Sequence, residues 1–336
     1  MAPTILSNNL LVNGLRTEFV DTYQAIKNRQ ADSRLGLVMD LSIQATNRSH
    51  EFAYLNAAPH PEEWKFGESI PTDAMDAVRW ETDVYNWARR VPWSKWDRKD
   101  DQTQSLFDMA RSAGEAHALI PERIFFGLLQ NDATDLLPAI PNAPDGVGLF
   151  SSATRFGMAN GNLLATSGVT TVHDIRADYY SALEQFMGFQ DGKGQPLLSK
   201  ETIDAGVIII HAASVTEAFE TTFLQQKQAI GVDNTGAVGG TVVSSSASTN
   251  LMHDASRNVQ LWGTSRLTTA DEWYVLLANP PKKATYLLDR QDVQEFSAME
   301  GDNNSDSVRS TAQEYIQFES RSGGGIALPY GAIQIT

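Results

Sequence analysis

Cysteine is absent from this 336-residue sequence, and basic residues are scarce. Without cysteine the chain has no disulfide, no thiolate metal ligand and no cysteine nucleophile, so its fold depends on packing alone. The 26 Lys and Arg residues against 41 Asp and Glu residues give a net charge of -15. Because affinity for nucleic acids rests mainly on neutralising phosphates with Lys and Arg, this balance opposes a broad duplex-binding face.

Long hydrophobic runs are missing as well. The most apolar internal stretch, Gly206 to Ala213, is far too short to span a bilayer. The first residues, MAPTILSNNLLVNG, do not have a basic stretch followed by a long apolar one. We therefore expect a soluble protein without a secretion signal. With 42% hydrophobic residues, the chain can bury the core of one large domain or of two smaller ones.

Patterns typical of catalysis or of a bound ion are not found in the sequence. The six histidines are scattered, and no two stand at the spacing that places both on one helix face. His211 ends an apolar stretch, where a histidine is more often a structural residue than a base. Residues 302–306 begin like a calcium loop, but Ser307 and Gln313 stand where glycine and glutamate are required. We predict no catalytic residue, no cofactor and no metal, and hence no enzyme.

The N-terminal part has apolar residues at a spacing close to four: Leu11, Leu15, Phe19, Tyr23 and Ile26. This spacing predicts an amphipathic helix from Leu10 to Ala31. The apolar face of such a helix needs a partner surface. That surface belongs either to its own domain, as for most amphipathic helices, or to another copy of the chain.

Tryptophan is concentrated in one region of the chain. Between Ser49 and Asp97, short alternating stretches separated by prolines predict strands around a long loop. Five of the seven tryptophans fall there: Trp64, Trp80, Trp87, Trp93 and Trp96. Few aliphatic residues accompany them, so these rings are either buried between copies or packed as a patch within one domain. Composition alone favours neither arrangement.

Helical patterns recur after residue 100. One helix face is predicted to carry these residues: Leu106, Met109, Ala110, Ala113 and His117. Pro121 should restart the chain as a second helix from Glu122 to Gln130, because proline fits the first turn of a helix. Further helices are predicted from Val172 to Gly188 and from Ser214 to Gln226.

Strand patterns dominate the last third. A buried strand is predicted at Val207–Ile210, and four alternating stretches follow, at residues 259–262, 273–277, 285–288 and 315–318. Residues 231–249, rich in Gly, Ser and Thr, are predicted to form a surface loop. Helices and strands without regular βαβ alternation indicate the α+β class.

Several short motifs follow one another in an informative order. They are Trp96-Asp97-Arg98-Lys99-Asp100-Asp101-Gln102, Leu106-Phe107-Asp108-Met109-Ala110, Pro121-Glu122-Arg123-Ile124-Phe125-Phe126-Gly127-Leu128-Leu129, Asp145-Gly146 and Leu149-Phe150-Ser151. This order resembles the central stretch of Mu-like phage major head subunits. That family commonly has a Cys before the Asp-Gly turn and a His after the Phe-Ser stretch. Here Cys is absent and Thr154-Arg155-Phe156 stands near the His position.

The resemblance implies an α+β fold of the Hong Kong 97-like capsid type, with four regions. These would be an N-terminal arm (1–45), an extended loop (46–97), a peripheral domain with a spine helix (98–165 and 308–336) and an axial domain (166–307). The implied function is that of a major capsid protein, which self-assembles into the icosahedral head of a tailed, Mu-like phage. An encapsulin-like compartment shell and an unrecognised hydrolase are the alternatives.

The resemblance also implies partners and contact residues. The partners would be further copies in hexamers and pentamers, scaffold, portal and decoration proteins, and enclosed DNA bound without sequence specificity. No membrane is expected, and the protein would be made in the host bacterial cytoplasm and reside in the virion. The candidates for contacts between copies are Leu11, Leu15, Phe19, Tyr54, Trp64, Trp80 and Trp87. Some capsids of this fold form a Lys-Asn cross-link, which here would join Lys65 to Asn303 or Asn304. We regard an ordinary exposed side chain as the simpler interpretation of Lys65.

Overall fold

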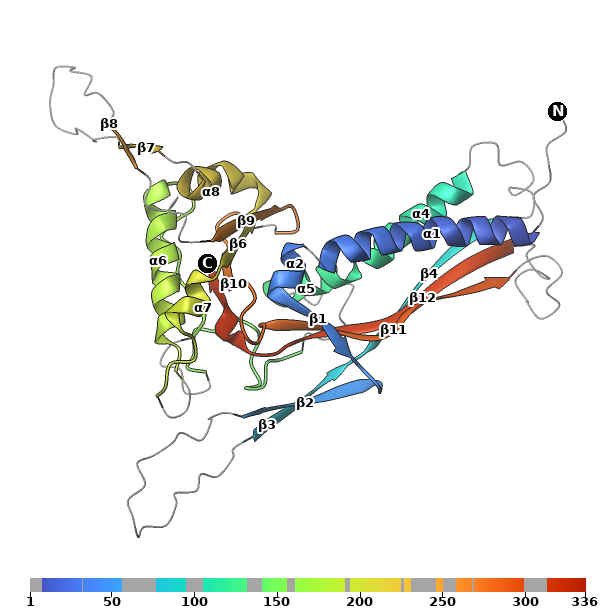
Figure 1. Ribbon diagram of the computed structural model, residues 1–336, viewed down its shortest axis with the longest axis horizontal. Helices are drawn as coiled ribbons and strands as arrows, with labels where there is room; N and C mark the ends of the chain where they lie inside the picture. The colour runs from blue at the N-terminus through green and yellow to red at the C-terminus, as the bar shows by residue number, and fades with distance from the viewer. Residues whose placement is uncertain are drawn as a thin grey trace, which may run out of the picture. The chain divides into compact units, whose positions relative to one another are not determined.

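The chain folds into two compact units, each assembled from separated stretches of sequence. The computed structural model describes residues 8–31, 33–55, 77–94, 105–131, 141–155, 161–190, 194–224, 227–230, 246–249, 258–267, 269–298 and 313–336. Unit 1 comprises residues 1–53, 79–142 and 285–326, and unit 2 comprises residues 54–78, 143–284 and 327–336. Figure 1 colours the elements of both units by their place in the chain.

A four-stranded sheet forms the base of unit 1, in the order β1-β11-β12-β4. The strands are β1 (Met39–Gln44), β11 (Thr285–Ala298), β12 (Gln313–Ile326) and β4 (Tyr85–Ser94). β1 is parallel to β11, whereas β12 is antiparallel to β11 and to β4. The strands predicted between Ser49 and Asp97 are confirmed, because a ribbon of β2 (Ser49–Leu55) and β3 (Ala77–Asp83) precedes β4.

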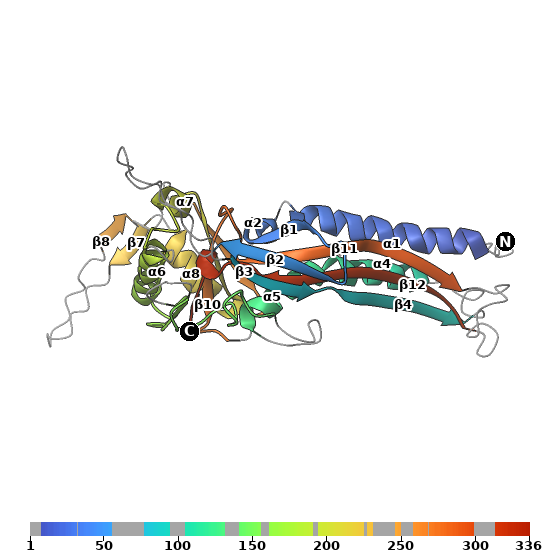
Figure 2. The ribbon, with the colours of Figure 1, turned by 90° about the horizontal axis from the view of Figure 1, so that it is seen from below.

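Helices cover one face of this sheet. α1 (Asn8–Ala31) lies alongside α4 (Ser105–Ala118), and Figures 1 and 2 both show the pair running along the long strands. The shorter helices are α2 (Arg34–Val38) and α5 (Ile120–Gln130). The predicted helices from Leu10 to Ala31 and from Glu122 to Gln130 are confirmed, with Pro121 in the first turn of α5.

The packed face of α4 differs from its prediction at one residue. Leu106, Ala110, Ala113 and His117 are buried, but Met109 is 43% exposed. The buried positions repeat at intervals of four, three and four, which defines one stripe along the helix. Met109 lies outside that stripe, so its predicted burial was wrong.

Unit 2 is built on a five-stranded sheet in the order β5-β13-β10-β6-β9. Its strands are β5 (Leu163–Leu164), β13 (Ala332–Ile335), β10 (Trp273–Leu277), β6 (Val207–Ala212) and β9 (Val259–Thr264). Its helices are α6 (Val172–Gly188), α7 (Lys200–Asp204) and α8 (Thr216–Phe223), with 3-10 turns at Ala213–Val215 and Pro329–Gly331. A separate hairpin pairs β7 (Lys227–Ile230) with β8 (Ser246–Thr249).

Both faces of the unit 2 sheet are covered. Every residue of β6 is buried, as predicted for Val207–Ile210. On one face, the ring of Phe219 in α8 lies 5.1 Å from that of Trp273. Tyr274, the next residue of β10, instead has its ring 5.4 Å from Phe150. Because neighbouring residues of a strand point to opposite faces, α8 covers one face and the segment around Phe150 covers the other.

Other predictions in unit 2 hold in part. The helix from Val172 to Gly188 is confirmed with the predicted bounds. The helix predicted from Ser214 to Gln226 is shorter, because a 3-10 turn precedes α8. Of the loop predicted over residues 231–249, the last four residues form β8, and residues 231–245 lie outside the described part of the chain.

The two units divide the chain differently from the regions expected from the sequence. β11 belongs to unit 1, because it pairs along most of its length with β12. β13 belongs to unit 2, because it pairs with β10 and β5. Residues 143–165 also belong to unit 2, where Asn162 donates hydrogen bonds to the carbonyls of Pro329 and Ala332. The expected division placed β11 with the axial region and β13 with the peripheral one.

Candidate assembly surface

Three of the predicted contact residues lie on the inner face of α1. Leu11 is 3% exposed, and Leu15 and Phe19 are not exposed at all. They pack with residues of α4, β4 and β12, and the ring of Phe19 stacks on that of Phe318 with 3.5 Å between centroids. Their apolar character is thus accounted for within one copy of the chain. Side chains so deeply buried have no surface left for contact with a second copy in this conformation.

The predicted tryptophan contacts have mixed surroundings. Trp80, in β3, is half-buried, with its ring stacked on that of Phe52 and its Nε1 donating to the hydroxyl of Tyr286 at 3.3 Å. Trp87, in β4, is also half-buried and donates to the carbonyl of Ser322 at 2.9 Å. Both rings are anchored within unit 1 and keep part of their surface exposed.

Two predicted contact residues, Tyr54 and Trp64, remain, together with Trp93 of the same tryptophan-rich region. Tyr54 lies in β2, and Trp64 lies outside the described residues. Trp93, in β4, is 3% exposed and donates to Oε2 of the buried Glu314 at 2.8 Å. At least this tryptophan is a core residue of unit 1, which is the arrangement within one domain that the composition left open.

The unit 1 sheet has a second face, opposite the helices, that the sequence analysis did not single out. In β12, Glu314, Ile316, Phe318 and Ser320 are buried, and the residues between them are half-buried. In β4, Val91 and Trp93 are buried and the residues that alternate with them are exposed or half-buried. We call this second face the open face; it consists of Asn86, Ala88, Arg90, Pro92, Tyr315, Gln317, Glu319 and Arg321.

Polar side chains on the open face are held in place by their neighbours. The guanidinium of Arg90 lies over the ring of Tyr315, 4.0 Å from its centroid, and donates to Oε1 of Gln317 at 2.8 and 3.0 Å. Gln317 in turn donates to Glu319, and Arg321 donates to Asn86 at 2.7 Å. Ordered Arg and Tyr side chains lose little conformational freedom on binding and are over-represented among residues that dominate protein interfaces. The open face is therefore the candidate assembly surface of unit 1.

Polar contacts also fix α1 to its own sheet. The hydroxyl of Tyr23 donates to Oδ1 of Asp292 at 2.7 Å, and Nζ of Lys27 donates to the same atom at 3.1 Å. Burial alone would raise the pKa of Asp292, but the hydrogen bonds from Tyr23, Val293 and Lys27 outweigh it and lower that pKa. Burial raises the pKa of the neighbouring Asp289, 3.8 Å from the same ammonium group. This cluster anchors the C-terminal half of α1.

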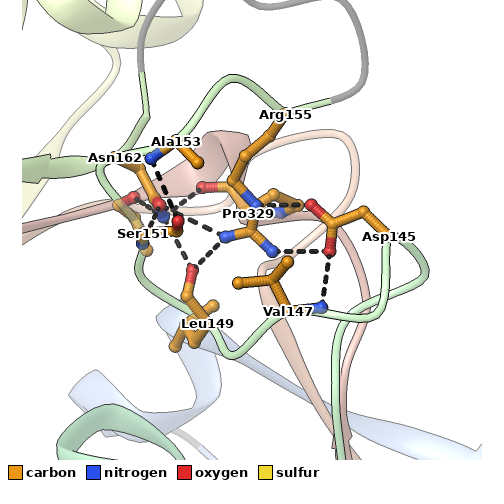
Figure 3. A network of polar contacts seen from close by, with 9 residues as sticks. Asp145, Val147, Leu149, Ser151, Ala153, Arg155, Asn162 and Pro329 are labelled. Carbon is orange, nitrogen blue, oxygen red and sulfur yellow. Dashed lines mark hydrogen bonds and ion pairs between the residues drawn. The ribbon is translucent and has the colours of Figure 1, made fainter.

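A buried ion pair organises unit 2 (Figure 3). The side chain of Arg155 is 1% exposed and donates to both carboxylate oxygens of Asp145, at 2.6 and 2.8 Å. Arg155 also donates to the carbonyl of Leu149 at 2.6 Å and to Oδ1 of Asn162 at 3.2 Å. The side-chain amide of Asn162 in turn donates to the carbonyls of Pro329 and Ala332. Asp145-Gly146 was noted as a sequence motif, but the ion pair between Asp145 and Arg155 was not predicted, because nothing in the sequence indicates a partner ten residues away.

Chemical groups for catalysis do not gather in the described part of the chain. Among the described residues, no three His, Asp or Glu side chains lie together as a metal site requires. His211 is buried, with Nδ1 2.9 Å from the carbonyl of Ala212 and its ring stacked on Phe219, which fits its predicted structural role. The calcium-like segment 302–306 and the residues of the cross-link considered above lie outside the described residues. None of the described helices is long and apolar enough to cross a bilayer.

Comparison with known proteins identifies the fold. No family model and no curated protein matches the sequence. Among solved structures, the chain is similar to the capsid of an empty GTA particle, with 10% identity over 90% of this chain and 88% of that one and a TM-score of 0.54. It is also similar to the capsid of Myoviridae phage XM1, with 13% identity over 90% of each chain and a TM-score of 0.51.

A further structural neighbour is not named as a phage capsid. It is a virus-like particle from Pyrococcus furiosus, with 10% identity over 96% of this chain and 97% of that one and a TM-score of 0.50. These likenesses extend over nearly the whole chain and include both units. The chain therefore has the Hong Kong 97-like capsid fold, of mixed α and β structure, as the resemblance implied.

Proposed function

We propose that this chain is a major capsid protein, which self-assembles into the icosahedral head of a tailed, Mu-like phage. The observation that carries the proposal is the likeness to capsid chains over 90% of this chain. A structural role of this kind also accounts for a sequence without a recognisable catalytic motif. The Mu-like assignment rests on the order of short motifs between Trp96 and Ser151, and on Gly194-Gln195-Pro196-Leu197 followed by Val207–Ile210 and a helix.

Assembly would proceed by contacts between unlike surfaces of identical copies. Such heterologous contacts close into rings, and rings of five and six copies close a shell. A permanent assembly of this kind needs interfaces of roughly 2,000 Å² or more. We assign the open face to one side of such a contact. Tyr54, Trp64, Trp80 and Trp87, from the extended loop of residues 46–97, are our candidates for the other side.

Other partners follow from the same role. A phage head requires a portal and usually a scaffold protein, and decoration proteins can bind its outside. The excess of acidic residues fits a wall that surrounds DNA without binding it tightly, because duplex affinity depends on basic residues. In the shell, unit 1 would be the peripheral domain and unit 2 the axial domain.

A second candidate is a compartment shell of the encapsulin kind, which would enclose a protein cargo in a cell. The specific observation that favours it is the likeness to the virus-like particle from Pyrococcus furiosus, which covers 96% of this chain. Both candidates predict closed shells, so the contents of the particle distinguish them. A phage head should contain DNA or assemble with a portal, whereas a compartment should contain one defined protein.

Electron microscopy combined with light scattering on the purified chain tests the proposal. Closed shells, or rings of five and six copies, are the expected result, with or without a co-expressed scaffold. Absorbance at the nucleic-acid maximum and mass spectrometry of purified particles then identify the contents. A chain that stays monomeric alone and with scaffold would overturn both candidates.

A further inference from the structure

In the sheet of unit 1, two strands from the late part of the chain lie between two strands from the early part. β1 and β4 lie at the edges of the sheet, and β11 and β12 lie between them. Met39 of β1 pairs with Thr285 of β11, and Ser94 of β4 pairs with Gln313 of β12. Within the described residues, the edge strands are thus joined only through strands made much later. The open face has the same property, because half of its residues come from β4 and half from β12.

Unit 2 shows the same arrangement at β13. This strand lies between β5 and β10, with Gln334 paired to Leu163 and Ile333 paired to Val275. Ala332, Ile333 and Ile335 are fully buried. In the described sheet, β5 has no partner besides β13, so removing this strand would also detach β5.

Polar groups made early in unit 2 also depend on β13 and the turn before it. Asn162 is fully buried, and its Nδ2 donates to the carbonyls of Pro329 at 3.4 Å and Ala332 at 3.0 Å. Its backbone carbonyl accepts from the amide of Gln334 at 3.0 Å, and the carbonyl of Leu164 accepts from the amide of Thr336 at 3.0 Å. Nδ2 of Asn162 keeps a partner in the carbonyl of Leu149, at 2.8 Å. Before the late residues are present, the backbone carbonyls of Asn162 and Leu164 would lose these hydrogen bonds, which disfavours the folded loop.

We propose that, because of this strand order, a chain can assemble only after it has been synthesised through β13. Incomplete chains would therefore not enter the shell. Before the late strands are made, β1 and β4 have no strand between them, and in the described sheet of unit 2 only β10, β6 and β9 can pair, with the buried edge of β10 and the strand β5 left without β13. Closing loops between such distant strands is slow, so the units are completed late in synthesis.

A chain made only to a point before β12 lacks both the open face and a closed unit 2, whereas a chain that extends through β12 but lacks β13 has the residues of the open face and still lacks a closed unit 2. The part of this inference that concerns the shell rests on the proposed function, whereas the part that concerns folding does not.

Protease resistance of nascent chains tests the folding part. Chains held on ribosomes at a series of lengths are treated briefly with a protease, and the surviving fragments are identified. Resistance of residues 143–284 is expected only at lengths that place β13 outside the ribosome. Resistance of this segment when β11 and β12 have emerged but β13 has not would overturn the inference.

Mixed assembly with full-length variants tests the part that concerns the shell. Fluorescently labelled Ile333→Asp, which places a charge on the buried face of β13, is co-expressed with the unlabelled chain. Thr336→Asp, at an exposed position just after the same strand, is the matched control. The expected result is loss of the Ile333→Asp label from purified shells and retention of the Thr336→Asp label.

The two arms separate the possible failures. Equal incorporation of Ile333→Asp and Thr336→Asp into shells would overturn the requirement for β13. If the unlabelled chain forms no shells at all, the proposed function and the shell part of the inference fail together. The ribosome experiment still decides the folding part in that case.

Discussion

In unit 1, alternate residues of β4 and β12 point to opposite sides of the sheet. The two faces that they form differ in residue composition and in contacts. Toward the helices, Ile316 and Phe318 enter a core shared with Leu15 and Phe19. Toward the other side, Arg90 forms hydrogen bonds and a ring contact across the strand pair. The first face gains its stability by removing apolar area from water, whereas the second retains polar groups that are ordered but still accessible. A strand pair can thus hold one copy together on one side and offer a contact on the other.

The largest effect on stability is expected at the packed face. Phe318→Ala should lower the free energy of unfolding by about 3–5 kcal/mol, because it removes a buried ring stacked on Phe19 and leaves a cavity. Tyr315→Ala, three residues earlier in β12 and on the open face, should cost about 1 kcal/mol or less, since its ring is only half-buried. Chemical denaturation measures both. Equal losses would show that the two faces do not differ as described.

The close contact between α1 and α4 should produce the next largest effect. A Cβ at Gly114 would lie 2.7 Å from the backbone oxygen of Phe19. Gly114→Ala is expected to lower the free energy of unfolding by about 1–3 kcal/mol, because one backbone must move. At Gly188, in the last turn of α6, an added Cβ meets nothing within 4 Å. Gly188→Ala should therefore not destabilise the chain, and a loss as large as that of Gly114→Ala would contradict the explanation.

A smaller effect is expected where polar groups anchor α1. Asp292→Asn should cost about 1 kcal/mol at neutral pH, a value kept low because the carboxyl is half exposed. The pKa of Asp292 is lowered in the folded chain from its ordinary value of 3.8, so its contribution is complete above that pH and is lost as the pH falls through the folded-state pKa.

Asp289 supplies the matched control for that prediction. Its pKa is raised by burial in the folded chain, so ionised Asp289 does not favour folding. Asp289→Asn should therefore leave stability at neutral pH unchanged or higher. Thermal unfolding of the two variants at neutral and acidic pH measures the difference. Loss of stability in Asp289→Asn equal to that in Asp292→Asn would refute the assignment.

Much of the secondary structure was predictable from sequence, because the patterns that define it are local. The spacing of Leu11, Leu15 and Phe19 predicted α1, and the β-branched run Val207–Ile210 predicted the centre of β6. The partner of the α1 face was not predictable, because the sequence allows it to pack on its own sheet or on another copy. Sheet order was not predictable either, since it depends on pairs as distant as Met39 and Thr285.

The candidate surface was predicted only in part. The concentration of tryptophans predicted Trp80 and Trp87 as contact residues, and in the structure both form hydrogen bonds within unit 1. The open face was missed, although Tyr315-Ile316-Gln317-Phe318 alternates plainly, because that pattern predicts a strand without showing which face is covered. From the sequence, Arg155 differed from the Mu-like pattern only by standing near the position where that family commonly has a His. Its burial against Asp145 required a turn geometry that residue types alone do not specify.

Sedimentation velocity of the purified chain and two variants tests the central claim most directly. Arg90→Glu changes the charge of the open face, and Arg123→Glu makes the same change at an exposed position of α5, on the opposite side of the sheet. Arg123→Glu should alter stability by about 0.5 kcal/mol or less, and Arg90→Glu, which also loses the contacts with Gln317 and Tyr315, by about 1 kcal/mol. The account predicts fast-sedimenting shells for the unaltered chain and for Arg123→Glu, and loss of them for Arg90→Glu. A single boundary at the 36.9 kDa of one chain for all three proteins, under every condition, would contradict it.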